Sequence, residues 1–179
     1  QSSLFTIARR RILWLLILVL ANGLTTKVIA MNDQILKEIV LLAAFIPLLI
    51  GTGGNVGAQS STVVIRGLST QKLKSLGAIK AVVKEAITGA LLGVFMMLVV
   101  FPFAWWQGEG PLIASAVGIS LISITTLAAT TGAILPLLFD RMKLDPALMS
   151  SPFITTITDI AGVFIYLSTA KWLLNQSLA

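Results

Sequence analysis

The sequence predicts an all-α membrane protein with five transmembrane helices in each chain. Of the 179 residues, 56% are hydrophobic and 11% are charged, and the mean hydropathy of +0.96 lies well above that of soluble domains. The charged residues also gather between apolar stretches that are long enough to cross a bilayer. These stretches, the predicted spans, are residues 12–31, 35–54, 81–103, 111–139 and 152–174.

The segments outside the spans are short. We expect residues 1–11 to form a cytoplasmic interfacial connector, residues 12–174 a five-helix transmembrane domain, and residues 175–179 an outside tail. The basic and apolar opening also has features of a signal peptide, but its apolar run continues through Val28 and Ile29, which favours a retained helix. Because the first residue is Gln rather than Met, we expect a piece of a larger protein whose remaining part is cytoplasmic.

The distribution of basic residues predicts the orientation in the membrane. Ten of the 13 lysines and arginines fall on the side of the N-terminus, and three, Lys27, Lys37 and Lys171, fall on the other. Because positive charge concentrates in cytoplasmic loops, we predict a multi-pass plasma-membrane protein with a cytoplasmic N-terminus and an outside C-terminus. The net charge of +6 then reflects topology, and nucleic acid is not an expected partner.

Composition also restricts the chemistry. The chain contains no Cys and no His, which excludes disulfides and thiolate or imidazole metal sites and leaves hard oxygen ligands. The pattern Gly-x-Gly-x-x-x-Gly at residues 51–57 lacks a following GK[ST] and does not match a phosphate-binding loop. We therefore expect neither an enzyme nor an ATP-driven pump.

Asp159 is predicted to be the only acidic side chain deep within a span. If its helix begins near Pro152, seven residues at about 1.5 Å each place it roughly 10 Å from the membrane edge. A charge at that depth is costly without a partner and indicates a functional site. Helical spacing puts four residues on one polar face that we expect to line a cavity: Thr155, Asp159, Gly162 and Tyr166. The alternative is an Asp that is neutral or hydrogen-bonded to neighbouring Ser and Thr.

A second unusual stretch follows Pro47, where four of the 14 glycines lie within residues 51–57. Glycine weakens a helix, and a Pro followed by clustered Gly within a span is typical of a discontinuous transmembrane helix whose free backbone groups face a cavity or an ion. The alternative is close helix packing through the small-xxx-small pair Gly53 and Gly57. The sequence leaves both interpretations open.

The two stretches are predicted to meet inside the membrane. The second span enters from outside near Ile35, so about 20 residues bring it to the inner edge near Gly54. The fifth span enters from inside and places Asp159 in the same inner third. We therefore expect Asp159 beside residues 51–55, and Asn55 is a candidate ligand with it.

The remaining segments are predicted to play supporting roles. The third span ends in the aromatic run 101–106 and is expected to face lipid. The fourth is rich in Ser, Thr and Gly and is expected to pack against other helices or contact water. The basic loop 67–84 is expected at the interface, with its lysines toward lipid head groups or a cytoplasmic partner.

Two separated motifs resemble those of the MgtE family of magnesium channels and transporters. The run GTGGNVGAQ at residues 51–59, preceded by Pro47 and followed by RGL at 66–68, resembles the family signature. The runs DPA at 145–147, SP at 151–152 and TTITDIAG at 155–162 resemble the family's last helix. The resemblance covers essentially the whole chain and fits the count of five spans.

The resemblance implies a homodimer with an ion path at the subunit interface, lined by the second and fifth helices. Asp159 would then occur twice and be the main determinant for a largely hydrated Mg²⁺, helped by oxygens at Gly54, Ala58, Ser151 and Thr155. Some members carry Asn at the positions of Ala58 and Ser151, so side-chain amides are lost there. The family also has cytoplasmic N-terminal and CBS domains that close the pore at high magnesium, and neither is in this sequence.

The leading hypothesis is a Mg²⁺-selective channel or transporter that moves magnesium into the cytoplasm down its electrochemical gradient through a pore at the dimer interface. The expected partners are a second copy, the lipid bilayer and the cytoplasmic regulatory domains. Two alternatives stay open: a proton-coupled secondary carrier in which Asp159 binds the proton, and a membrane scaffold without transport. Flux measurements distinguish the three hypotheses. A channel gives flux set by voltage and ion gradient alone, a carrier shows fixed proton coupling, and a scaffold shows no flux.

Overall fold

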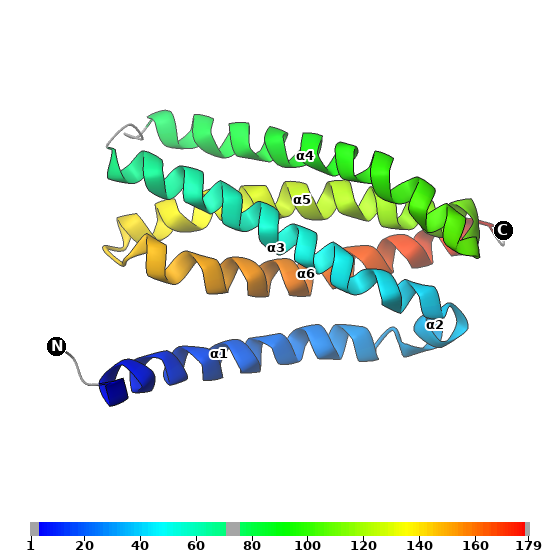
Figure 1. Ribbon diagram of the computed structural model, residues 1–179, viewed down its shortest axis with the longest axis horizontal. Coiled ribbons are helices and arrows are strands. Elements are labelled where there is room, and N and C mark those ends of the chain that lie inside the picture. Colours follow the sequence, from blue (N-terminus) through cyan, green and yellow to red (C-terminus); the bar gives the residue numbers. More distant parts are fainter. Residues whose placement is uncertain (1–3, 71–75, 178–179) are drawn as a thin grey trace.

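The computed structural model describes residues 4–70 and 76–177, and every element in these ranges is helical. Figure 1 shows long helices that run along a common direction, with the two chain ends at opposite ends of the bundle. The prediction of an all-α fold is confirmed. The elements are α1 (Leu4–Ala30), α2 (Asp33–Glu38), α3 (Val40–Ser69), α4 (Leu76–Ala104), the π-helical turn η1 (Trp105–Glu109), α5 (Gly110–Arg141) and α6 (Pro146–Ser177).

Four helices are long and apolar enough to cross a membrane: Val40–Ser69, Gly77–Gln107, Gly110–Arg141 and Pro146–Asn175. They correspond to the predicted second to fifth spans. In α1 the apolar stretch found among the described residues is shorter, Leu18–Ala30. The first span, and with it the count of five, stays a prediction. The predicted connector is continuous with α1 from Leu4, and α6 runs through most of the predicted tail to Ser177.

The central helix of the bundle is α5. It packs against α3, α4 and α6, and 61% of its apolar stretch is buried, compared with 17% for α4. Three of its threonines are satisfied within the helix because their hydroxyls donate to carbonyls one turn earlier, as Thr125 does to Leu121 (2.8 Å), Thr126 to Ile122 (2.7 Å) and Thr130 to Thr126 (2.7 Å). The expectation that the fourth span packs against other helices is confirmed.

Glycines let the neighbours of α5 approach its backbone. A Cβ atom at Gly132 of α5 would collide with the Gly57 carbonyl of α3. A Cβ atom at Gly89 of α4 would lie 2.6 Å from the carbonyl oxygen of Thr125 in α5. Side chains at these positions would push the helices apart, so the glycines fix the spacing of the bundle.

The glycine-rich stretch of α3 is an unbroken helix, so the discontinuous-helix interpretation is wrong and the packing interpretation is correct. A Cβ atom at Gly53 would lie 2.8 Å from Cγ2 of Ile124 in α5, and one at Gly57 would collide with Ile154 of α6. Contacts with two neighbouring helices compensate for the poor helix propensity of glycine, because tertiary packing supplies most of the stability of a helix.

The boundaries of the predicted second span, residues 35–54, are also wrong. The chain breaks at Ile39, whose φ of −129° and ψ of 84° are not helical, so α3 begins at Val40 rather than at residue 35. It then continues beyond residue 54 to Ser69, through part of the predicted loop 67–84, and α4 starts at Leu76 within the same segment. Only residues 71–75 of that loop lie outside the described residues.

The start of α6 is fixed by its sequence. Asp145 accepts a hydrogen bond from the backbone N–H of Ala147 (2.9 Å), as an N-cap residue does, and Pro146 occupies the first helical position, where its missing N–H costs nothing. The preceding turn closes through Leu144, whose N–H donates to the carbonyl of Phe139 (2.9 Å). Asp145 and Pro146 therefore set where α6 begins and which residues it presents to α3.

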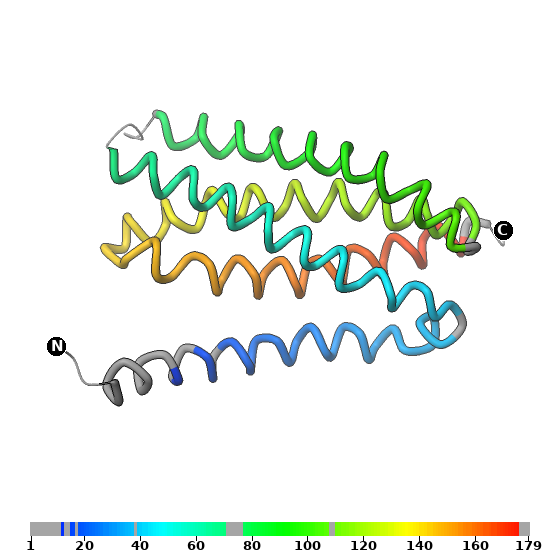
Figure 2. The backbone as a smooth tube through the Cα atoms, viewed as in Figure 1, coloured from blue at the N-terminus to red at the C-terminus, as the bar shows by residue number. Residues whose placement is uncertain are grey.

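The described basic side chains separate between the two ends of the bundle. We call the end where α3 and α5 finish and α4 and α6 begin the basic end; Lys72 and Lys74 lie outside the described residues. Figure 1 shows that α1 begins at this end, and Figures 1 and 2 show that α1 and α4 form opposite edges of the bundle. The basic end holds Arg66, Lys80, Lys84, Arg141 and Lys143, and the opposite end holds Lys27, Lys37 and Lys171.

Candidate functional site

The candidate residues lie where α3 and α6 run side by side in opposite directions. A Cβ atom at Gly54 would lie 3.8 Å from Cγ2 of Thr155, and a Cβ atom at Gly162 would lie 3.7 Å from Cγ2 of Ile50. This register places Asp159 at the level of residues 51–52 of α3. The glycine-rich stretch and the Asp159 region therefore meet, as the argument from depth predicted.

A polar row follows α6 at four-residue spacing and consists of Ser151, Thr155 and Asp159. The first two side chains are exposed and Asp159 is half-buried. The Thr155 hydroxyl donates to the carbonyl of Pro152 (3.0 Å), so its proton is used within the helix while its oxygen remains an acceptor. The row thus offers oxygen acceptors along the side of α6 next to α3.

The Asp159 carboxylate has no hydrogen-bond donor or cationic partner among the side chains that the structure describes, and those of residues 4–11 lie outside this description. The nearby Thr158 hydroxyl donates instead to the carbonyls of Ile154 and Thr155, both at 2.9 Å. The ion pair found in this part of the chain joins Lys37 and Asp33 at the opposite end of the bundle. The hydrogen-bonded alternative for Asp159 therefore finds no partner in the described part of the protomer, and an ionised Asp159 would be uncompensated there; the neutral alternative stays open.

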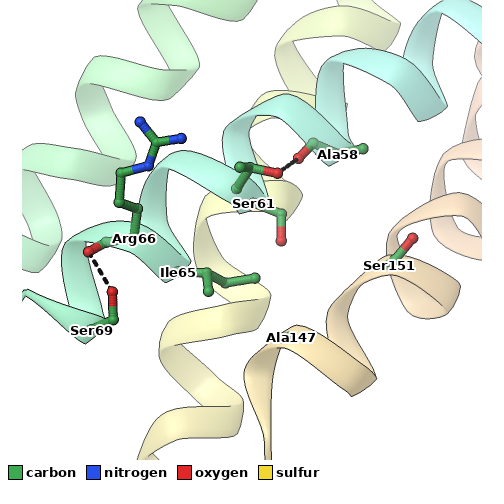
Figure 3. Close-up of a pocket in the computed structure, with 8 residues that line it drawn as sticks. Ala58, Ser61, Ile65, Arg66, Ser69, Ala147 and Ser151 are labelled. Atoms are coloured by element: carbon green, nitrogen blue, oxygen red, sulfur yellow. Dashed lines mark hydrogen bonds between the residues drawn. The ribbon is translucent and has the colours of Figure 1, made fainter.

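A cleft of about 460 Å³ opens between the end of α3 and the start of α6. Figure 3 shows α3 and α6 on its two sides, with Ala58 and Ser61 on α3 facing Ser151 on α6, and with the Arg66 guanidinium directed away from Ser151. Hydroxyl groups and the Arg66 side chain contribute polar atoms to a lining that is otherwise apolar. Its lining consists of Ala58, Ser61, Thr62, Ile65, Arg66, Ser69, Ala147 and Ser151.

The cleft, which we call the mouth, lies at one end of the contact between α3 and α6, and we call the line of candidate residues that runs from it along this contact the α3–α6 groove. Ala58 and Ser151 line the mouth, Gly54 and Thr155 lie about one helical turn deeper, and Asp159 lies one turn beyond. The structure thus gathers these five predicted site residues along one groove. Asn55, the sixth, lies on the exposed surface of α3 next to Gly54.

Comparison with known proteins identifies the family. Residues 46–169 match the sequence model of MgtE, described as a divalent cation transporter. This chain belongs to the MgtE family. It is 39% identical to the magnesium transporter MgtE of Thermus thermophilus over 92% of this chain, and 34% identical to those of Bacillus subtilis (95% of this chain) and Enterococcus faecalis (92%). The chain spans 36–38% of the length of these relatives.

Membership in the MgtE family confirms several sequence-based expectations. The chain is part of a multi-pass membrane protein, and its family consists of transporters rather than enzymes. The matched region includes both motifs on which the resemblance was based, the glycine-rich stretch of α3 and the row around Asp159.

Two residues expected on the cavity-lining face of α6 lie elsewhere in this MgtE-family chain. Gly162 is buried against Ile50 of α3 and Ile124 of α5, and Tyr166 is completely buried. Helical spacing does place them on the same face as Thr155, but α3 and α5 cover that face at the level of Gly162. The exposed part of the row therefore ends near Asp159.

Sequence reasoning also missed an acid. Glu85 of α4 is only 9% exposed, so a second acidic side chain is buried near the basic end of the bundle; the prediction that Asp159 is the only acid deep within a span concerns depth and stays a prediction. A signal was present, because Glu85 shares a helical face with Gly89 and Gly93, which pack against α5. The residues that line the cleft include no acid, and Asp159 is the one acid among the six candidate site residues.

Proposed function

We propose that this chain forms the Mg²⁺ pathway of a plasma-membrane transporter and carries Mg²⁺ into the cytoplasm. The three relatives are named magnesium transporters, and the family is described as transporting divalent cations. The observation that supports the proposal most directly is the uncompensated carboxylate of Asp159 at the inner end of the α3–α6 groove. A charge in that position needs a cation, and transported Mg²⁺ supplies one.

The groove suits a hydrated magnesium ion. Mg²⁺ keeps several waters and binds through one or two carboxylates, so the remaining lining needs only to accept hydrogen bonds from those waters. Hydroxyls of Ser151 and Thr155 and the carbonyl of Gly54 are such acceptors. The Ala58 carbonyl accepts both the helical N–H and the hydroxyl of Thr62 (2.9 Å), so both of its lone pairs are used, and Ala58 would contribute to the lining through its small side chain.

Charge balance favours a homodimer. A single carboxylate leaves a divalent ion half-neutralised in a medium of low dielectric, and Asp159 is the one acid among the candidate site residues of a protomer. A two-fold axis along the membrane normal that places two grooves face to face supplies the second carboxylate. Exposed residues on the groove side of α3, including Ala44, Gly51 and Asn55, are small enough for a second copy to approach closely.

The five-span topology with a cytoplasmic N-terminus is part of the same proposal. The basic end of the bundle holds more described cations than the opposite end, which favours the cytoplasmic side for it. At 27 residues, α1 is about 40 Å long, which is long enough for it to be the predicted first span and to bring the total to five. Regulatory regions that close the pathway at high magnesium would lie in the part of the relatives that this chain does not span.

The membrane potential provides the driving force. A divalent ion gains about 4.6 kcal/mol per 100 mV on entering a negative interior, twice the value for one elementary charge. No nucleotide hydrolysis is needed for uptake of this kind. Flux should therefore follow voltage and the Mg²⁺ gradient, without a fixed number of protons.

The decisive experiment replaces Asp159 by Asn in the full-length protein that contains this chain. Mg²⁺ uptake into proteoliposomes should fall by about 10- to 100-fold, because the variant leaves the ion without its carboxylates. Asp140→Asn is the matched control, since Asp140 is exposed at the basic end and should leave uptake unchanged. Unchanged uptake by Asp159→Asn would contradict the site, and stoichiometric proton movement with Mg²⁺ would favour the carrier.

A further inference from the structure

The outer surface of α4 and α5 carries two furrows at the basic end of the bundle. One, of about 270 Å³, lies between the two helices and is apolar apart from Arg141. The other, of about 380 Å³, lies on α4 and includes Lys80 and Lys84. Both are lined by Ile79 and Val83, so these two side chains form a ridge with a furrow on each side.

From these features we propose that this surface binds an anionic phospholipid. The phosphate group would contact Lys80, Lys84 and Arg141, and the two acyl chains would occupy the two furrows on either side of the ridge. We call this surface the lipid site. The lipid site lies away from the α3–α6 groove. The proposal of lipid binding is therefore independent of whether the chain transports Mg²⁺.

Charge complementarity supports an anionic head group. Lys80, Lys84 and Arg141 are exposed, and none of the three is paired with an acid within residues 4–70 and 76–177. Long cationic side chains at the end of a span extend toward the lipid head groups while their methylene groups cover apolar surface. Three such cations around one surface attract a head group with a net negative charge more strongly than a zwitterionic head group, whose own cation offsets its phosphate.

The apolar part of the surface supports a lipid rather than a small soluble anion. Ile79, Val83 and Ile87 are each more than half exposed, and Ile134 and Leu138 of α5 form the opposite wall of the first furrow. α4 continues as an apolar helix long enough to span, so acyl chains that follow the furrows stay in the hydrocarbon layer. A free phosphate would make no use of these side chains.

The test measures lipid binding to the purified full-length protein by native mass spectrometry, with phosphatidylglycerol and phosphatidylcholine of identical acyl chains. The wild type should retain phosphatidylglycerol preferentially. In the variant Lys80→Gln/Lys84→Gln/Arg141→Gln this preference should weaken by roughly fivefold for each cation removed. The matched control Lys27→Gln/Lys37→Gln/Lys171→Gln removes three cations from the opposite end and should keep the preference.

A second variant tests the furrow without changing charge. Leu138→Trp fills the furrow between α4 and α5 and should lower phosphatidylglycerol retention, whereas Leu98→Trp on the exposed surface of α4 outside the furrows should not. Equal retention by the triple-Gln variant and the wild type would overturn the proposal. Displacement of the lipid by millimolar inorganic phosphate, with no effect of Leu138→Trp, would overturn it in favour of a simple anion site.

Discussion

The outward faces of α3 and α4 differ in character although both helices are apolar enough to span a membrane. Along its central part α4 exposes large side chains, among them Leu91, Phe95 and Leu98. The corresponding part of α3 exposes Gly51 and Asn55, small or polar residues. Large apolar side chains pack well against acyl chains, whereas small ones gain little from lipid and allow another helix to approach. We therefore expect α4 to face lipid and α3 to face a second copy in the proposed dimer.

The largest expected effect on this comparison is in cysteine crosslinking, where a variant on one helix face should form dimers between two copies and a variant on the other face should form none. The chain has no Cys, so a single cysteine reports its own surroundings. In membranes, Thr155→Cys beside the α3–α6 groove should give abundant dimers with a short bifunctional thiol reagent. Phe95→Cys on α4 should give monomers, and so should Gly162→Cys, because Gly162 is buried within the protomer. Dimers from Phe95→Cys but not from Thr155→Cys would reverse the assignment of the two faces.

The next effect concerns the groove itself. Gly54→Val should reduce Mg²⁺ uptake by about tenfold or more, because a branched side chain beside Thr155 narrows the pathway. The protomer should still fold, since a Cβ atom at Gly54 makes only a 3.8 Å contact with Thr155. Gly23→Val on α1 is the control, because its Cβ atom would meet nothing within 4 Å. Equal uptake by the two variants would show that Gly54 does not line the pathway.

The smallest effect concerns Arg66 at the mouth of the groove. If a guanidinium lies roughly 10 Å from the ion across salt-containing water, each of the two Arg66 side chains of a dimer repels the divalent ion by well under 1 kcal/mol. Removing both charges by Arg66→Gln should therefore raise Mg²⁺ uptake by about threefold at low salt. The gain should shrink at high ionic strength. Lys84→Gln on α4, which is also exposed near the basic end, should not alter uptake. A decrease with Arg66→Gln would indicate that the arginine binds something that uptake requires.

Much of the fold follows from the sequence because span length and charge distribution are local properties. The third to fifth spans fall within helices of the structure, the second overlaps α3, and the predicted meeting of the two motifs needed only the rise of a helix and the positive-inside count. Five candidate site residues were found in the same way, since each belongs to one of two unusual stretches. Their roles as ligands stay predictions.

The parts that sequence reasoning missed depend on neighbours. The glycine-rich stretch of α3 has poor helix propensity and is nevertheless helical, because Ile124 and Ile154 pack against Gly53 and Gly57. Gly162 has the helical phase of the polar row and is nevertheless buried, because α3 and α5 cover it. Periodicity predicts which residues share a face, but only the arrangement of the other helices decides which part of that face is covered.

The contact between the Gly57 carbonyl and Gly132 has a mechanical consequence. Helices that touch backbone to backbone have no layer of side chains between them that can change rotamer, so α3 cannot roll or slide on α5 without losing the contact. The wall of the groove and the core of the protomer must then move as one rigid body. In a dimer, the width of the path would be changed by tilting one whole protomer against the other, and its oxygen lining would stay the same throughout the movement.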